Sequence, residues 1–105
     1  MANSRLVAFY QGNGRDHRGR LLRDIHAFDF DELEFHHDYI QWLFPLPEPS
    51  GANPAAPLLT KEDIAAFERD ESLRSALLTS FRLMLAFYGL DLLIRGSECD
   101  VVPGV

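Results

Sequence analysis

The hydrophobic residues of this chain recur at the three- and four-residue spacing of helices over most of its length. A first short helix is predicted over residues 6–10, and the run ends at Gly12, a residue type common just past a helix end. A second helix is predicted over residues 21–28, where leucine and isoleucine side chains fall on one side.

The third predicted helix, over residues 30–44, has the clearest start signal. Asp29 is a preferred N-cap residue, and Glu32 follows it by three positions, as in a capping box. Apolar side chains then cover most of the helix circumference, so we expect this helix to be central and packed on several sides. Pro45 ends it, because the residue before a proline is pushed out of the α region.

A proline-rich loop is predicted over residues 45–57, which hold five of the six prolines. Each proline fixes φ and removes a backbone donor, so regular structure is not expected there. Thr60 then caps a fourth helix, and Asp70 caps a fifth that Gly89 ends or kinks.

These elements together predict an all-α fold, a compact bundle of four to five helices with a long proline-rich loop. The domain is expected to cover residues 1–95. Residues 96–105 are expected to form a flexible tail.

Composition narrows the classes of partner and location. A chain of 105 residues is long enough for one domain, and its net charge of −6 repels phosphate backbones, so we expect no nucleic-acid binding. The most apolar window, residues 77–94, includes Arg82 and Asp91, which indicates a buried helix and no transmembrane insertion. Cys99 is the single cysteine, which excludes an intramolecular disulfide and favours an intracellular, soluble protein.

The candidate metal ligands are Glu34, His36, His37 and Asp38. Glu and His side chains spaced i, i+3 or i, i+4 share a helix face, as in bundles that bind two iron ions. The Glu-x-x-His pair occurs once, however, so a metal-assisted enzyme and an ordinary helix surface both remain open. No nucleophile or nucleotide motif stands out, and we expect no cofactor and no enzymatic activity.

One stretch of the chain is locally basic. Its members are Arg15, His17, Arg18, Arg20 and Arg23. Such a cluster either holds an anion or forms a solvated loop and helix start.

An aromatic-rich segment runs directly into the proline loop. Aromatic rings and fixed backbone offer a peptide rigid contact area at low entropic cost. The same rings are equally suited to form a core on which the loop folds back. Both interpretations remain open for the candidate ligand-binding residues, which are Tyr39, Trp42, Phe44, Pro45, Pro47 and Pro49.

Several motifs of the chain resemble the opioid growth factor receptor conserved domain. They are FYxG at 9–12, HDYIQWLFP at 37–45, the PEPSG and N-x-x-A-P-L-L that follow, and FYGL at 87–90. The resemblance covers roughly residues 9–92. It implies an all-helical domain found in vertebrate receptors for an opioid peptide, which are intracellular, associated with the nuclear periphery and without a transmembrane helix.

The resemblance also implies a shortened domain, because the family continues for several helices beyond FYGL. Apolar helix surface left uncovered in this way tends to become an interface. We therefore expect a homodimer through Leu83, Met84 and Phe87.

The sequence as a whole predicts a non-enzymatic module that binds a peptide or protein of unknown identity. A metal-assisted enzyme that uses the Glu/His/Asp cluster, or a purely structural or regulatory subunit, are the alternatives.

Overall fold

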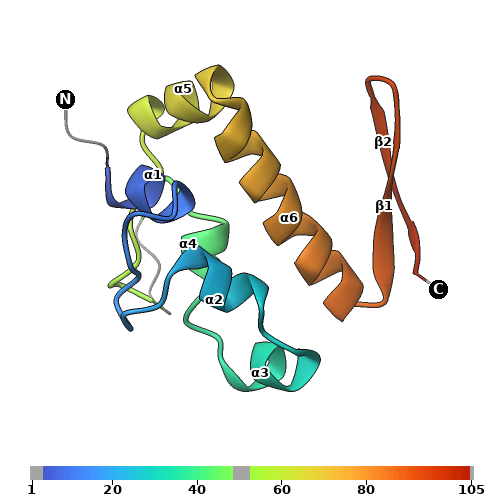
Figure 1. The fold of residues 1–105 in the computed structure, drawn as a ribbon, viewed down its shortest axis with the longest axis horizontal. Helices are drawn as coiled ribbons and strands as arrows, with labels where there is room; N and C mark the ends of the chain where they lie inside the picture. The colour runs from blue at the N-terminus through green and yellow to red at the C-terminus, as the bar shows by residue number, and fades with distance from the viewer. Residues whose placement is uncertain (1–3, 49–52, 105) are drawn as a thin grey trace.

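The computed structural model describes residues 4–48 and 53–104. Within these ranges the elements, in chain order, are α1 (Arg5–Tyr10), α2 (Leu22–His26), α3 (Phe30–Phe35), α4 (Ile40–Leu43), α5 (Lys61–Arg69), α6 (Glu71–Phe87), β1 (Leu90–Arg95) and β2 (Glu98–Pro103). The long helix α6 runs across the molecule, with α1, α2 and α5 on one side and the two strands on the other (Figure 1). In the described part of the chain, no helix is both long and apolar enough to cross a membrane.

The helix caps predicted from the sequence are confirmed. The Asp29 carboxylate accepts the Glu32 backbone N–H at 2.8 Å, and the Glu32 carboxylate accepts the Asp29 N–H at 3.1 Å. Thr60 caps α5 in the same reciprocal way with Asp63, and the Asp70 carboxylate accepts the Ser72 N–H at the start of α6. Gly89 ends α6 with a φ of +77°, a conformation that glycine adopts without steric penalty.

The starts of α1 and α5 are joined through their caps. The Ser4 hydroxyl accepts the Val7 N–H at 3.1 Å and donates its own proton to Asp63. Asp63 is buried and also accepts the Thr60 N–H at 2.9 Å. One carboxylate therefore stabilises two helix starts that lie far apart in the sequence.

The prediction of a single helix over residues 30–44 is wrong. The helix stops at Phe35, His36 takes an extended conformation with ψ 140°, and a new helix begins at Ile40. The break allows the His36 ring to stack on Phe28 at 5.2 Å and brings the Asp38 carboxylate to within 3.0 Å of Arg20. These tertiary contacts override a local helix preference, which is a weak determinant on its own.

The prediction of an all-α fold is also wrong, because residues 90–103 form an antiparallel hairpin. Its two-residue loop lies between the paired residues Arg95 and Glu98. Gly96, the first loop residue, has a φ of +60°, and a type II′ turn requires a positive φ at this position. β2 begins with alternating acidic and apolar residues, but β1 holds the uninterrupted apolar run Leu92–Ile94, which follows closely on the apolar residues of α6. The window over residues 77–94 is thus part helix and part strand, and β2 lies in the segment expected to be a tail.

The hydrophobic core is centred on Trp42, whose side chain is 0% exposed. Its ring packs against Phe9, with 5.1 Å between the two ring centroids. The Arg5 guanidinium lies over the Trp42 ring, 5.1 Å from its centroid. The remaining fully buried apolar side chains come from α1 to α4 and α6, and include Leu6, Ile25, Leu33, Leu43 and Leu73.

Replacing Trp42 by alanine should lower the free energy of unfolding by about 3–5 kcal/mol, because truncation leaves a cavity in the core. Phe35→Ala is the matched control, since that ring is 79% exposed and its loss should change stability by less than ~1 kcal/mol. Urea unfolding followed by far-UV circular dichroism measures both. A Trp42→Ala protein with unchanged stability would contradict this placement of the indole.

Candidate functional site

A groove of about 430 Å³ lies between α1, α5 and α6. Its walls are almost wholly apolar, and the principal side chains are those of Tyr10, Phe44, Pro45, Ile64, Phe67 and Leu77. The volume is that of a small-molecule or side-chain pocket, and the wall chemistry is typical of such sites.

Local sequence explains how the wall forms. Ile64 and Phe67 are three residues apart and therefore share one face of α5. Pro45 cannot continue α4, so the chain turns away after Phe44 and leaves both side chains beside the groove. The Leu59 N–H donates to the Leu46 carbonyl at 2.9 Å, which joins the two ends of the proline segment.

The rim of the groove carries two charged residues, Glu68 and Arg74. The Arg74 guanidinium donates to the carbonyl oxygens of Phe67 and Glu68, at 3.0 and 2.5 Å, and so caps the C-terminal end of α5. Its charge is held at the helix end. The groove can therefore recognise apolar shape, with few polar contacts to offer a ligand.

The Tyr10 hydroxyl fixes the inner wall of the groove. It lies 2.8 Å from the Leu43 carbonyl oxygen and 2.9 Å from Ser80 Oγ. Burial raises the pKa of Tyr10 well above its ordinary value, which outweighs the lowering by the Ser80 hydrogen bond. The phenol thus stays protonated and links α1, α4 and α6.

Ser80 also lies 2.8 Å from His26 Nε2, a contact that a nucleophile and its base can make. Burial lowers the pKa of His26, so the ring is neutral at pH 7. Ser80 itself is fully buried and its oxygen already contacts Tyr10, so no substrate can reach it in this structure. The pair stabilises the packing of α2 on α6.

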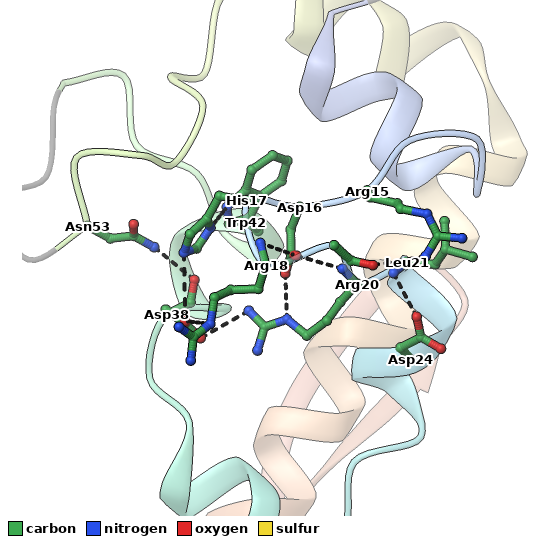
Figure 2. A network of polar contacts seen from close by, with 11 residues as sticks. Arg15, Asp16, His17, Arg18, Arg20, Leu21, Asp24, Asp38, Trp42 and Asn53 are labelled. Carbon is green, nitrogen blue, oxygen red and sulfur yellow. Dashed lines mark hydrogen bonds and ion pairs between the residues drawn. The ribbon is translucent and has the colours of Figure 1, made fainter.

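A second polar cluster surrounds Asp38 (Figure 2). The Asp38 carboxylate is bound by Arg18 Nε and Arg20 Nη2, both at 3.0 Å, and His17 Nε2 lies 3.7 Å away. The Asn53 amide donates to the Asp38 carbonyl at 2.8 Å, which ties the proline segment to the same turn. Figure 2 shows these side chains converging on Asp38 from separate parts of the chain.

The electrostatic balance at Asp38 favours the ionised form. Burial alone would raise its pKa, but the hydrogen bond and charge of Arg20, with the charge of Arg18, lower it overall. Arg20 is shared, because its Nε donates to Asp16 at 2.7 Å. The basic stretch is a surface loop and helix start, because Arg15, Arg18 and Arg23 are exposed and Arg23 lies in α2. It is not a free anion site at Arg18 and Arg20, since aspartates hold both side chains.

This cluster positions Trp42 directly. The indole N–H donates to His17 Nδ1 at 2.9 Å, so the neutral imidazole carries its proton on Nε2, the nitrogen that faces Asp38. A buried indole N–H without an acceptor would be destabilising. The link from Asp38 through His17 to Trp42 thus satisfies the one polar atom of the core ring.

The structure separates the six ligand-binding candidates. Tyr39 and Trp42 are buried in the core, with the Tyr39 hydroxyl donating to the Leu33 carbonyl at 2.9 Å. Phe44 and Pro45 are half-buried and line the groove. Pro47 is exposed outside the groove. The remaining candidate, Pro49, lies outside the described residues.

The four metal-ligand candidates are not brought together. Glu34 and His37 are exposed, and the half-buried His36 is held between the rings of Phe28 and Phe35. Asp38 is occupied by the arginines described above. Within residues 4–48 and 53–104, no three His, Cys, Asp or Glu side chains are arranged to hold a metal ion.

The candidate dimer residues differ in accessibility. Met84 is buried in the core, and Leu83 and Phe87 are half-buried against it. Phe87 is also part of an aromatic group at the surface, because its ring contacts Phe30 at 5.9 Å and Tyr88 at 5.2 Å.

Comparison with known proteins accounts for most of the chain. The family model described as the opioid growth factor receptor (OGFr) conserved region matches residues 8–99. The chain belongs to this family.

Curated relatives agree with the family match. The opioid growth factor receptor of Rattus norvegicus is 44% identical over 82 residues, which are 75% of this chain and 14% of the rat protein. The receptor of Mus musculus is 47% identical over 77% of this chain and 13% of its own length. Opioid growth factor receptor-like protein 1 of Xenopus tropicalis is 39% identical over 71% of this chain and 14% of its own length. No solved structure matches the chain.

The chain thus spans about one seventh of the length of these relatives. The matched region, residues 8–99, includes the groove wall from Tyr10 to Leu77 and the Asp38 cluster. It ends within β2, so most of the hairpin belongs to the family region.

The groove wall that α5 and α6 supply was not predicted from the sequence. The signal was present, because Ile64 and Phe67 at i, i+3 are the apolar face of a mostly polar helix. The predicted ligand-binding residues instead include Tyr39 and Trp42, which are in the core.

Asp38→Asn should lower the free energy of unfolding by about 1–2 kcal/mol at pH 7, because charge-assisted hydrogen bonds to two arginines are lost. The lowered pKa of Asp38 means that its contribution is complete above about pH 4 and is lost as the pH falls through the folded-state value. Urea titrations at pH 7, 4 and 3 should therefore show the variant and the parent converging at the acid end.

Asp91→Asn is the control for this experiment, since Asp91 is exposed and lies 3.7 Å from Arg82. It should change stability by less than ~0.5 kcal/mol at any pH. A constant difference between Asp38→Asn and the parent down to pH 3 would show that the charge of Asp38 is not what stabilises the turn.

Proposed function

We propose that this member of the opioid growth factor receptor family is a non-enzymatic binding module. Its ligand is a peptide or protein segment whose apolar side chains enter the groove between α1, α5 and α6. The observation that carries the proposal is the groove itself, with its apolar walls and a volume of about 430 Å³.

The groove chemistry selects the class of ligand. A cavity with so few polar groups does not orient a reacting substrate, but it gains free energy whenever apolar surface leaves water. Large side chains spaced along one face of a peptide are the usual occupants of such grooves. Relatives of the chain in rat and mouse are named as receptors, which agrees with a ligand-binding role.

The groove gives the aromatic and proline residues two different roles in this proposal. Phe44 and Pro45 contact the ligand, because they line the groove. Trp42 and Tyr39 act from the core by holding α4 in place. An intracellular setting without nucleic-acid partners remains part of the proposal and rests on the single cysteine, the net charge of −6 and the family resemblance.

Ile64→Glu tests the groove, because this wall residue is 46% exposed and accepts a charge without unfolding the core. Peptides selected from a random display library against the parent protein should bind the variant at least ~10-fold more weakly, since the ligand would have to desolvate a carboxylate. Fluorescence anisotropy of the labelled peptides measures the change.

Phe81→Glu is the matched control, with a ring that is 39% exposed on α6 and outside the groove lining. It should leave peptide affinity within about twofold. Selected peptides that bind Ile64→Glu and Phe81→Glu equally well would refute the groove as the binding site.

We propose in addition that the protein forms a homodimer, with Phe87 at the interface. The aromatic group of Phe30, Phe87 and Tyr88 supports this, because Phe30 and Tyr88 are among the large exposed hydrophobic residues. Light scattering after size exclusion should give about twice the chain mass of 11.9 kDa. Tyr88→Glu should shift the mass to that of one chain, and a single-chain mass for the parent at micromolar concentration would refute the dimer.

A further inference from the structure

The two edges of the hairpin are not equivalent. The contacts of the hairpin with α6 are made mainly by β1, which follows directly after the helix (Figure 1). The outer edge of β2 is the edge that faces away from β1. Isolated two-stranded sheets are only marginally stable in water, and a free strand edge readily accepts a further strand.

The edge of β1 that faces away from β2 is occupied at Leu92. The Leu92 carbonyl accepts from the Arg82 guanidinium at 3.3 Å, and the Leu92 N–H donates to the Asp91 carboxylate at 2.7 Å. Both backbone groups of Leu92 therefore point away from β2. The residue of β2 that pairs with Leu92 is Val101. In an antiparallel ladder such a pair leaves the backbone groups of both residues pointing outward.

Among the described residues, none is bonded to the outward backbone groups of Cys99 and Val101, so the outer edge of β2 is the available one. Hydrogen-bonded and non-hydrogen-bonded pairs alternate along the ladder, so Cys99, two residues before Val101, is also in a non-hydrogen-bonded pair. Both residues therefore direct their N–H and C=O groups away from β1. Both residues are exposed, Val101 to 51%. Pro103 lacks an N–H and limits the edge on its C-terminal side.

The side chains along this edge have a definite chemistry. Cys99 and Val101 continue the apolar face that Leu92 and Ile94 form on β1. Glu98 and Asp100 point to the opposite face, and no arginine or lysine among the described residues forms an ion pair with either of them. A strand added here would meet apolar neighbours on one face and two carboxylates on the other.

We propose that the outer edge of β2 binds an extended segment of a partner protein in which basic side chains alternate with apolar ones. The period of two places the basic residues opposite Glu98 and Asp100, and the apolar residues opposite Cys99 and Val101. Backbone hydrogen bonds to Val101 and Cys99 hold the strand, and the charge pairs select it. This site is separate from the groove between α1, α5 and α6.

A second copy of the chain is a poor occupant of the same edge. Antiparallel pairing of two β2 strands centred on Asp100 sets that residue opposite its own copy, and pairing centred on Cys99 sets it opposite Glu98. Pairing centred on Val101 still leaves the two Asp100 side chains as diagonal neighbours. Like charges in these positions are destabilising, and the net charge of −6 adds to the repulsion.

The test uses a labelled Lys-Val-Lys-Val-Lys-Val peptide and, as controls, a Glu-Val repeat and a Lys-Lys-Lys-Val-Val-Val peptide of equal charge. Fluorescence anisotropy at low salt should show the alternating peptide binding at least ~5-fold more tightly than the block peptide and the Glu-Val repeat not binding. Amide resonances of Cys99 and Val101 should shift on addition of the alternating peptide. Equal binding of the two cationic peptides would show charge attraction alone and overturn the proposal.

Val101→Pro removes the outward N–H while leaving the hairpin bonds to β1 intact, and it should reduce binding at least ~10-fold. Val101→Ala keeps the N–H and is its matched control, with a change of no more than about threefold. A peptide N-methylated at alternate residues should also fail to bind the parent, which tests the backbone contact without any change in the protein.

Unchanged affinity for both Val101→Pro and the N-methylated peptide would overturn the proposal. So would a loss of dimer mass in Val101→Pro, since that would make a second copy the occupant. Ile64→Glu should bind the alternating peptide as the parent does, which separates this site from the groove.

Discussion

The position of α4 depends on the ion pairs that Asp38 makes with Arg18 and Arg20. The sequence from Phe30 to Phe44 has the periodicity of one helix, yet the chain leaves the helix at His36 so that Asp38 can face the arginines. A buried or half-buried carboxylate between two guanidinium groups is well satisfied, whereas the same groups left unpaired would oppose folding. This contact converts one long helix into two short ones with different directions.

The altered direction of α4 has consequences on both sides of the core. Trp42 enters the core with its N–H on His17, and the chain beyond it delivers Phe44 and Pro45 to the groove. The Tyr10 hydroxyl then fixes the distance from α1 to the end of α4 through the Leu43 carbonyl. The apolar groove is thus the outer face of a core whose helices are positioned by polar contacts. These contacts pair the buried polar groups with one another, so the groove walls are left apolar.

Local signals in the sequence predicted what local interactions determine. The caps at Asp29, Thr60 and Asp70 and the end of α6 at Gly89 follow from short-range hydrogen bonding and backbone freedom, and all appear in the structure. The break at His36 could not be predicted in this way, because it is set by arginines about twenty positions earlier in the chain. The sequence-based candidates include two residues that line the groove, Phe44 and Pro45, but none from α5, because the groove neighbours of the α5 residues come from distant segments.

The hairpin was missed for a different physical reason. A run such as Leu90 to Ile94 fits the buried face of a helix as well as a strand, and only the two-residue loop at Gly96 distinguishes them. On the body of the protein this hairpin is anchored at one edge by Arg82 and by the buried Leu92. On its other strand, acidic and apolar side chains alternate from Glu98 to Val101. Such an arrangement adds little to the stability of the fold itself, so its regularity is better explained by a strand-shaped partner than by packing within the chain.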